Sequence, residues 1–257
     1  MKKILSIVLA AMMLMACVSC GGAKVADVDA VKAAGKMIIG ITEYAPMNYK
    51  DENGEWTGFD TEFAELVCEK LGVAAEFIVI DWDNKILELD SKGIDAVWNG
   101  MTITDEVKNG MSVSNAYVKN AQVVVMAADA VANYADAASM ADLAFAVEAG
   151  SAGEAAAADA GLTNVTAVVD QATALMEVAS GSVDACVIDI TMANAMTGEG
   201  TSYTDLGYAV ELTTEEYGIG FRKGSDLAEE VNKIMADLIA DGTLPALAEK
   251  YSLTLAN

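Results

Sequence analysis

"KGIDAVWNG", residues 92–100, joins the end of one predicted element to the start of the next. The preceding "NKILELDS" has a helical pattern, and Gly93 is the residue type that most often follows the last turn of a helix. "IDAVWNG" is a short apolar run before a glycine, which is typical of a buried strand. The same order returns in "SGSVDACVID", residues 180–189. The chain is therefore predicted to contain two related helix–strand–loop units.

Strands and helices alternate on both sides of these units. "KMIIGI" and "AAEFIVI" are predicted strands, and "TEFAELVCEKLG" between them is a predicted helix. "AQVVVMA", "AFAV" and "NVTAVV" are predicted strands of the second half, and "DLAEEVNKIMADLIADG" is a long amphipathic helix. Such alternation favours an α/β fold with mainly parallel sheets, in which ligands bind beyond the carboxyl ends of strands. The loops that begin at Gly100 and Asp189 both lie at such ends.

The composition excludes several classes of function. The 257 residues include 15 Lys and Arg against 39 Asp and Glu, for a formal net charge of -24. This charge repels nucleic acid, so nucleic-acid binding is not expected. The chain has no His, which removes the usual general base and the commonest metal ligand. Cys68 and Cys186 are expected to be buried free thiols, with a disulfide as the alternative, and neither a metal site nor a cofactor is expected.

The N-terminus has the features of a targeting segment. Lys2 and Lys3 precede a largely apolar run, residues 4–16, that is too short to span a bilayer. "LMACVSCGG", residues 14–22, begins at the end of this run and resembles a lipoprotein signal box with Cys17 as the acylated residue. Cys20 is the alternative, and an ordinary secretory signal is a third option. We expect a signal peptide at 1–16, a mobile tether at 17–36, and an extracytoplasmic protein anchored to the cell membrane by its N-terminal lipid.

"GFDTEFAELVCEKL", residues 58–71, resembles the signature of the extracytoplasmic solute-binding proteins that serve polar amino-acid ABC transporters, bacterial solute-binding protein family 3. The resemblance extends over residues 37–251, including "WDNKILELDSKGIDAVWNGMTIT", "DACVID" and "EYGIGFRKGSD". It implies a two-lobed, type II periplasmic-binding-protein-like fold, each lobe a mainly parallel sheet flanked by helices. Lobe 1 would combine 37–117 with 217–257, lobe 2 would be 123–211, and 118–122 and 212–216 would be two hinge strands.

The resemblance also implies a ligand site in the cleft between the lobes. The family's aromatic walls fall on Tyr44 and Trp82, although either ring could instead belong to the core. Gly100 matches a position whose carbonyl accepts from the ligand ammonium, and Thr102 matches one that donates to its carboxylate. Ser151 falls at a helix N-terminus, which suits an anion, with a plain helix cap as the alternative. Asp189 matches the acid that pairs with the ammonium.

The resemblance fails at Val107, where the family has an Arg that grips the α-carboxylate by a bidentate pair. Arg222, the only Arg of the chain, is expected in a surface turn, "FRKGSD", outside the cleft. Three interpretations follow: the carboxylate is held more weakly by Thr102, Ser151 and backbone N–H groups, the ligand lacks it, or the alignment shifts locally. Glu43 and Glu148 lie beside site positions and favour a cationic ligand, unless both face solvent.

The family implies a lipid-anchored, monomeric binding component of an ABC importer. Its partners would be an amino acid or related small amine in the cleft, the permease subunits, and the membrane through the lipid. One alternative is a sensing protein that docks on a membrane receptor. A dehydratase-like enzyme on the same fold is disfavoured, because the chain has no His and no nucleophile–base pair is recognisable.

Overall fold

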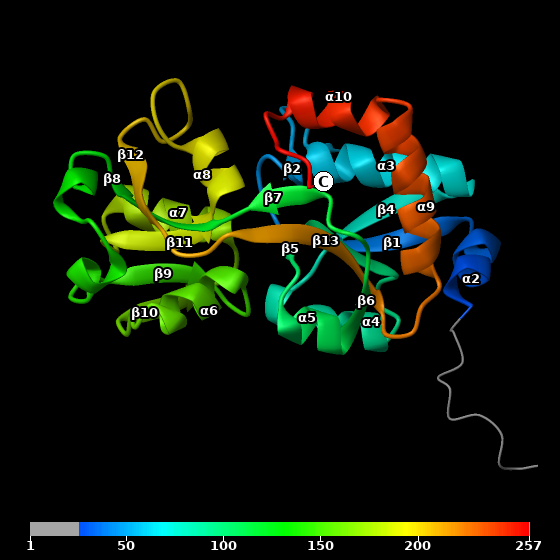
Figure 1. The fold of residues 1–257 in the computed structure, drawn as a ribbon, viewed down its shortest axis with the longest axis horizontal. Coiled ribbons are helices and arrows are strands. Elements are labelled where there is room, and N and C mark those ends of the chain that lie inside the picture. Colours follow the sequence, from blue (N-terminus) through cyan, green and yellow to red (C-terminus); the bar gives the residue numbers. More distant parts are fainter. Residues whose placement is uncertain (1–25, 257) are drawn as a thin grey trace, which may run out of the picture.

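The computed structural model describes residues 26–256, so the predicted signal peptide, Cys17 and Cys20 lie outside the described residues. Two lobes lie side by side, each built around one sheet (Figure 1). No helix within residues 26–256 is both long and apolar enough to cross a membrane. Cys68 and Cys186 are buried free thiols, which confirms the prediction. Burial raises the pKa of the Cys68 thiol to about 12.

Lobe 1 contains a six-stranded sheet. Its order is β4-β1-β5-β13-β6, with β7 paired to a further part of β13. These strands are β1 (Lys36–Ile41), β4 (Ala74–Val79), β5 (Ala96–Thr102), β6 (Met111–Val113), β7 (Val118–Asn120) and β13 (Glu215–Arg222). A small hairpin of β2 (Tyr49–Lys50) and β3 (Trp56–Thr57) precedes the first long helix.

Helices cover both faces of this sheet. On one side lie α3 (Phe59–Leu71), α9 (Leu227–Ala240) and α10 (Thr243–Lys250), as Figure 1 shows. On the other lie α4 (Lys85–Asp90), which follows a short 3-10 helix η1 (Trp82–Asn84), and α5 (Asp105–Gly110). The apolar positions of α3, among them Phe63 and Val67, are fully buried against Trp98 and its neighbours, because the helical period places them on one face.

Lobe 2 contains a five-stranded sheet in the order β10-β9-β11-β8-β12. These strands are β8 (Gln122–Ala127), β9 (Phe145–Glu148), β10 (Val165–Val168), β11 (Ala185–Asp189) and β12 (Leu206–Glu211). The helices are α6 (Ala152–Asp159), α7 (Gln171–Ser180) and α8 (Ile190–Met196), with 3-10 helices η2 (Val131–Asn133) and η3 (Ala137–Met140). The strands predicted within "KGIDAVWNG" and "SGSVDACVID" are β5 and β11, one in each lobe.

The sheets are mixed, with more antiparallel pairing than the alternation of elements predicts. β1 pairs in parallel with β4 and β5, and β9 pairs in parallel with β10 and β11. β13 runs antiparallel to β5, and β8 runs antiparallel to β11. The reason is topological, because β8 and β13 belong to the chain segments that pass from one lobe to the other and therefore run against the strands beside them.

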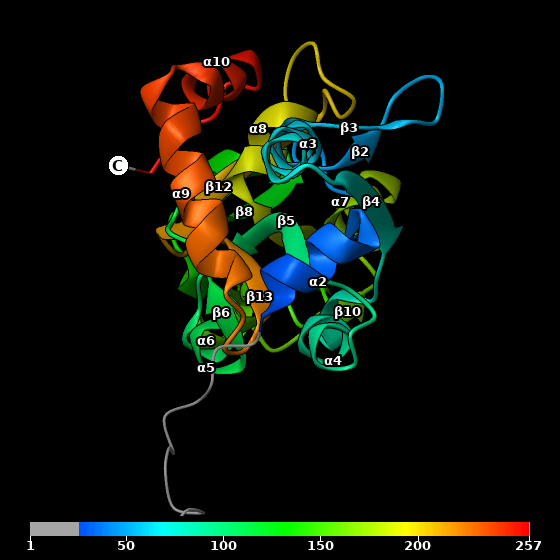
Figure 2. The ribbon, with the colours of Figure 1, turned by 90° about the vertical axis from the view of Figure 1, so that its right-hand side faces the viewer.

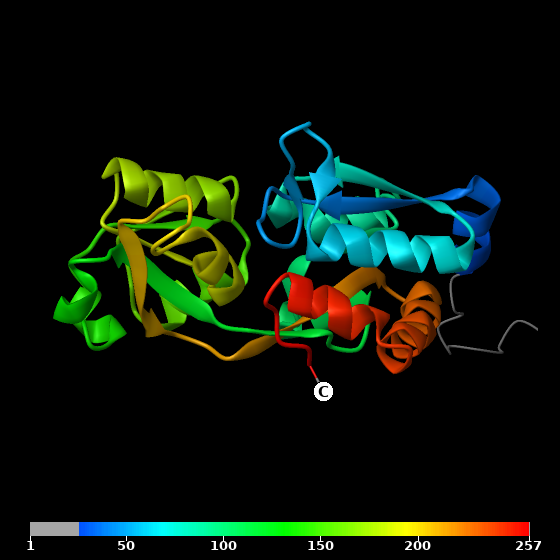
Figure 3. The same cartoon turned by 90° about the horizontal axis from the view of Figure 1, so that it is seen from above.

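Two chain segments connect the lobes. β7 passes into β8 through Ala121, and β12 passes into β13 through residues 212–214; the two connections lie side by side (Figure 3). The N–H of Leu212 donates to the carbonyl of Gln122 over 2.8 Å, and the N–H of Gln122 donates to Thr213 Oγ1 over 3.0 Å. The crossing is therefore a short two-stranded ribbon.

The prediction of a mobile tether at 17–36 is wrong for residues 27–34. Residues 27–34 form a helix, α2 (Asp27–Ala34), that lies against the end of lobe 1 beside α9 (Figure 2). Val31 is buried there, and the N–H of Val28 donates to Asp226 Oδ1 over 3.0 Å. The segment is polar in composition, but it forms an amphipathic helix whose apolar side packs on the lobe.

Arg222 is not in a surface turn, as its sequence context predicts, but buried at the end of β13. Its Nη2 lies 3.2 Å from Asp27 Oδ1 and 3.8 Å from Asp95 Oδ1, and its Nη1 donates to the carbonyl of Leu89 over 2.6 Å. These two carboxylates offset the free-energy cost of burying the guanidinium charge. Arg222 therefore ties α2 to lobe 1, and it does not line the cavity described below.

Candidate ligand-binding site

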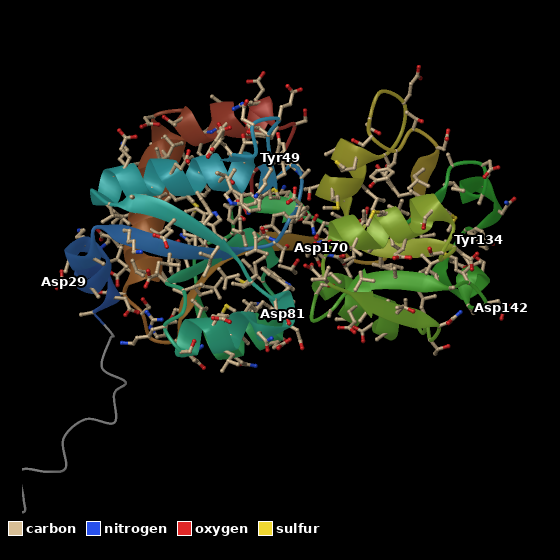
Figure 4. The ribbon with its side chains drawn as sticks, turned by 180° about the vertical axis from the view of Figure 1, so that it is seen from behind. Asp29, Tyr49, Asp81, Tyr134, Asp142 and Asp170 are labelled. Carbon is tan, nitrogen blue, oxygen red and sulfur yellow. The ribbon has the colours of Figure 1, made fainter. Side chains whose placement is uncertain are left out.

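A cavity of about 180 Å³ lies between the lobes. Lobe 1 contributes the end of β5 with parts of α4 and α5, and lobe 2 contributes the ends of β9 and β11 with the start of α6. Figure 4 shows Asp81, which precedes Trp82, and Asp170, which precedes Gln171, on the two sides of this junction. The predicted site residues that line the cavity are Trp82, Gly100, Thr102, Val107, Glu148, Ser151 and Asp189.

Two predicted site residues do not line the cavity. Glu43 is exposed, so its carboxylate faces solvent. Tyr44 is 1% exposed, and its hydroxyl forms 2.5 Å hydrogen bonds with Thr191 Oγ1 of lobe 2 and with the hydroxyl of Tyr217. The ring packs behind Gly100, where an added Cβ would lie 2.6 Å from Tyr44 Cε1. Tyr44 is thus an inter-lobe contact beneath the cavity, not an aromatic wall of it.

Asp189 lies at the end of β11, 3% exposed, within a ring of amide donors. Its Oδ1 accepts from Gln122 Nε2 over 2.8 Å and from Asn120, and its Oδ2 accepts from Gln171. The side-chain Oε1 of Gln171 in turn accepts from the backbone N–H of Asp189 over 2.9 Å. Burial, and next the charge of Glu215, raise the pKa of Asp189 to about 7. A cation placed in the cavity would favour the ionised form.

Glu215 at the start of β13 shares these donors. Its Oε1 accepts from Thr102 Oγ1 over 2.6 Å, from Asn120 Nδ2 over 2.6 Å and from Gln122 Nε2 over 2.7 Å. The hydroxyl of Thr102 is therefore donated to Glu215, and not left free for a ligand carboxylate as the resemblance implies. Sequence reasoning placed Asn120, Gln122 and Glu215 in the predicted hinge strands 118–122 and 212–216 and did not assign them to the site, although polar residues within the hinges were a usable signal.

Glu148 reaches the cavity from the end of β9. It is 3% exposed, and its Oε1 has no hydrogen-bond partner among the described residues. Burial, followed by the charges of Asp189 and Asp170, raises the pKa of Glu148 to about 8. An unpartnered buried carboxylate oxygen at a cavity wall is an acceptor that a ligand donor would satisfy.

Lys85, the first residue of α4, is a positive charge in the cavity that sequence reasoning missed. It is 5% exposed, and its Nζ donates to the carbonyls of Trp82, over 3.2 Å, and Gly150, over 2.8 Å. Nζ also lies 5.2 Å from the centroid of the Trp82 ring. Burial lowers the pKa of Lys85, against the opposing effect of Glu106 and Glu148. Because Gly150 belongs to lobe 2, this lysine bridges the lobes.

The start of α6 forms the adjoining wall. Ser151 is its N-cap, and the serine hydroxyl accepts from the N–H of Glu154 over 3.1 Å, so the helix-cap interpretation holds for the side chain. Within residues 26–256 the N–H groups of Ala152 and Gly153 have no hydrogen-bond partner.

Val107 is 2% exposed, packs in an apolar cluster with Trp82 and lines the same cavity.

Residues 37–254 match the family model of bacterial extracellular solute-binding proteins, family 3. This chain belongs to that family. The L-cystine-binding protein TcyJ of Escherichia coli (strain K12) is 30% identical over 224 residues, which cover 86% of this chain and 84% of that protein. The L-arginine-binding protein of Pseudomonas aeruginosa is 31% identical over 232 residues, covering 85% and 89%.

The solved structures agree with the two-lobed fold. An ancestral amino acid-binding protein, AncCDT-1, a precursor of cyclohexadienyl dehydratase, matches with a TM-score of 0.80 at 30% identity, covering 88% of this chain and 99% of that one. The type II solute-binding fold is confirmed. The curated relatives named above are binding proteins, and the family is extracellular, so this solute-binding protein has a substrate-binding role outside the cytoplasm.

The buried carboxyls of this solute-binding protein predict a stability that falls as pH rises. Burial raises the pKa of Asp60 and Asp189 to about 7 and that of Glu148 to about 8. The folded state thus holds protons that the unfolded state has lost, so stability declines between about pH 4 and pH 8. We expect the ligand-free protein to melt about 5 °C or more higher at pH 5.5 than at pH 8.5, by differential scanning fluorimetry.

Glu148→Gln serves as the control for this pH dependence. It removes the carboxyl with the highest of the three pKa values, so the decline above pH 7 should become shallower while the decline below pH 6 persists. A melting temperature that rises from pH 5.5 to pH 8.5 would contradict the electrostatics described for this cavity.

Proposed function

We propose that this protein captures an amino acid in the cavity between its lobes and delivers it to the permease of an ABC importer. The observation that carries the proposal is the pair of buried carboxyls, Asp189 and Glu148, which line one cavity. Within residues 26–256 neither carboxyl forms an ion pair, although the charge of Lys85 acts on Glu148. A ligand ammonium would supply the missing charge and the missing donor. Relatives that bind cystine and arginine support this ligand class.

Closure of the lobes would use the two connections at residues 118–122 and 212–216 as hinges. The lobe 1 unit would be 37–117 with 217–257, and the lobe 2 unit 123–211. Contacts that bridge the lobes, such as Tyr44 with Thr191 and Lys85 with Gly150, would form on closure and break on opening. The closed form, with the ligand enclosed, is then the state that the permease recognises.

Anchoring at the membrane belongs to the same proposal. An acyl group on Cys17, or on Cys20, would hold the protein beside its permease on the outer side of the cell membrane. Metabolic labelling with palmitate should mark the wild-type protein, and Cys17→Ser should abolish the label. A label that persists in Cys17→Ser and disappears in Cys20→Ser would assign the lipid to the other cysteine.

A thermal-shift panel tests the ligand class. L-arginine, L-lysine, L-histidine and L-glutamine are compared at ~1 mM, L-cystine at its solubility limit, and D-glucose as a control. A dissociation constant of ~10 μM adds about 2.7 kcal/mol to the folded state at 1 mM, which shifts melting by ~5–10 °C. At least one amino acid should raise the melting temperature by this amount, and D-glucose should not raise it. A panel without any shift from amino acids would refute the proposal.

A further inference from the structure

We propose that Lys85 holds the carboxylate of the bound amino acid, and so replaces the Arg that is missing at position 107. The ligand is then a zwitterionic α-amino acid, and not an amine without a carboxylate. This inference rests on the proposed function, because it assigns one end of the ligand within the same cavity. It also removes the conflict between Val107 and an amino-acid site.

The first argument is the state of the Lys85 ammonium. It is 5% exposed, and its two protein acceptors are neutral carbonyl oxygens, those of Trp82 and Gly150. None of the ion pairs within residues 26–256 includes Lys85. Glu106 and Glu148 act on Lys85 by their charge, but neither carboxylate forms an ion pair with it among the described residues. A buried cation without a contacting counterion is costly, and an ammonium has three N–H donors. A ligand carboxylate would provide both the counterion and the third acceptor.

The second argument is the wall beside Lys85. The carbonyl of Gly150, which accepts from Nζ over 2.8 Å, directly precedes the N-cap of α6. The N–H groups of Ala152 and Gly153 follow, and both lack partners among the described residues. Lys85, Ser151 and Ala152 all line the cavity. A carboxylate oxygen at Lys85 would therefore share the cavity with the N-terminus of α6 and the N–H of Ala152, which is a favourable place for an anion.

The third argument is the separation of charge along the cavity. Asp189 is surrounded by Asn120, Gln122 and Gln171, and none of these contacts Lys85 through a hydrogen bond. The acidic group at β11 suits an ammonium. The basic group at α4, on which the charges of Glu106 and Glu148 also act, suits a carboxylate. Val107 and Lys85 border the same cavity from neighbouring helices, α5 and α4. The cavity therefore has a positive charge on α4, while the neighbouring position on α5 is Val107.

Isothermal titration with matched ligands tests the assignment. L-arginine is compared with agmatine, L-lysine with cadaverine and L-histidine with histamine, since each amine lacks only the α-carboxylate. For the amino acid that binds the wild-type protein, we expect the matching amine to bind about 10- to 100-fold more weakly, the range of one charged hydrogen bond. Lys85→Met should weaken the amino acid by a similar factor and leave the amine unweakened.

Lys108→Met is the matched control. It makes the same change one helix away, where the side chain is 58% exposed and does not line the cavity, so both affinities should stay at the wild-type values. Circular dichroism checks the folding of each variant. Equal binding of amino acid and amine by the wild-type protein would overturn the assignment without any variant. So would unchanged amino-acid binding by a folded Lys85→Met. If no amino acid binds the wild-type protein, the proposed function itself fails.

Discussion

Asp189→Asn is expected to weaken amino-acid binding by ~2–5 kcal/mol, the usual cost of truncating one partner of a buried charge pair. This corresponds to a loss of affinity from about 30-fold to several thousand-fold. The reason is local. Asp189 is 3% exposed, and its carboxylate is already held by Gln122 and Gln171, so the ligand ammonium would meet a fixed negative charge. Asn offers no charge and points an N–H₂ group at neighbouring donors. Isothermal titration at pH 8 measures the change.

Asp170→Asn is the control for Asp189→Asn. Asp170 is also near the lobe junction, but it caps α7 by accepting from the N–H of Thr173 over 2.7 Å and does not line the cavity. Asn caps helices as well as Asp does, and Asp170 acts on the cavity only through the effect of its charge on Glu148. The affinity should therefore change far less than in Asp189→Asn. Binding by a folded Asp189→Asn within about threefold of wild type would show that the ammonium lies elsewhere.

The largest loss of stability is expected for Gly58→Ala. Gly58 precedes α3 with φ +118°, and a Cβ there would lie 2.3 Å from the carbonyl oxygen of Met47. That oxygen is backbone and accepts from the N–H of Asp60 over 2.9 Å, so it cannot move aside cheaply. We expect a loss of at least about 3 kcal/mol, which lowers the melting temperature by ~6–12 °C.

Gly72→Ala provides the comparison at the other end of α3. Its φ is +78°, but an added Cβ meets nothing within 4 Å, so only the cost of the left-handed backbone remains, about 1 kcal/mol. Thermal melts of the two variants separate steric clash from backbone strain. Equal losses would contradict the tight contact at Gly58. Gly58→Ala should also perturb the cavity, because Asp60 Oδ2 accepts from the N–H of Gly100 over 2.6 Å.

Periodicity and local motifs predicted much of this molecule. The pattern around "KGIDAVWNG" located β5, and its echo located β11, because apolar runs between glycines become buried strands whatever the lobe. Predicted site residues that line the cavity, such as Gly100 and Asp189, lie at strand ends, where ligand sites gather in α/β folds.

What the sequence did not predict depends on contacts between distant segments. Lys85 looked like the polar start of a helix, and its acceptor at Gly150 lies in the other lobe. Arg222 was predicted to be exposed because its partner, Asp27, belongs to the segment that was predicted to be a tether. Tyr44 has the residue type of a ligand wall, but its hydroxyl is committed to Thr191. In each case the role of the side chain depends on a partner that is distant in the sequence. Local sequence patterns do not predict such a contact.

The most direct test of the central claim is a crystal structure of the protein with the amino acid that gives the largest thermal shift. We predict one ligand molecule in the cavity between the lobes, with its ammonium nitrogen in hydrogen-bond distance of Asp189 or Glu148 and its carboxylate in hydrogen-bond distance of Lys85 Nζ. An amino acid bound outside this cavity would contradict the proposed site, and one bound inside it with the carboxylate turned away from Lys85 would contradict the assignment of that lysine.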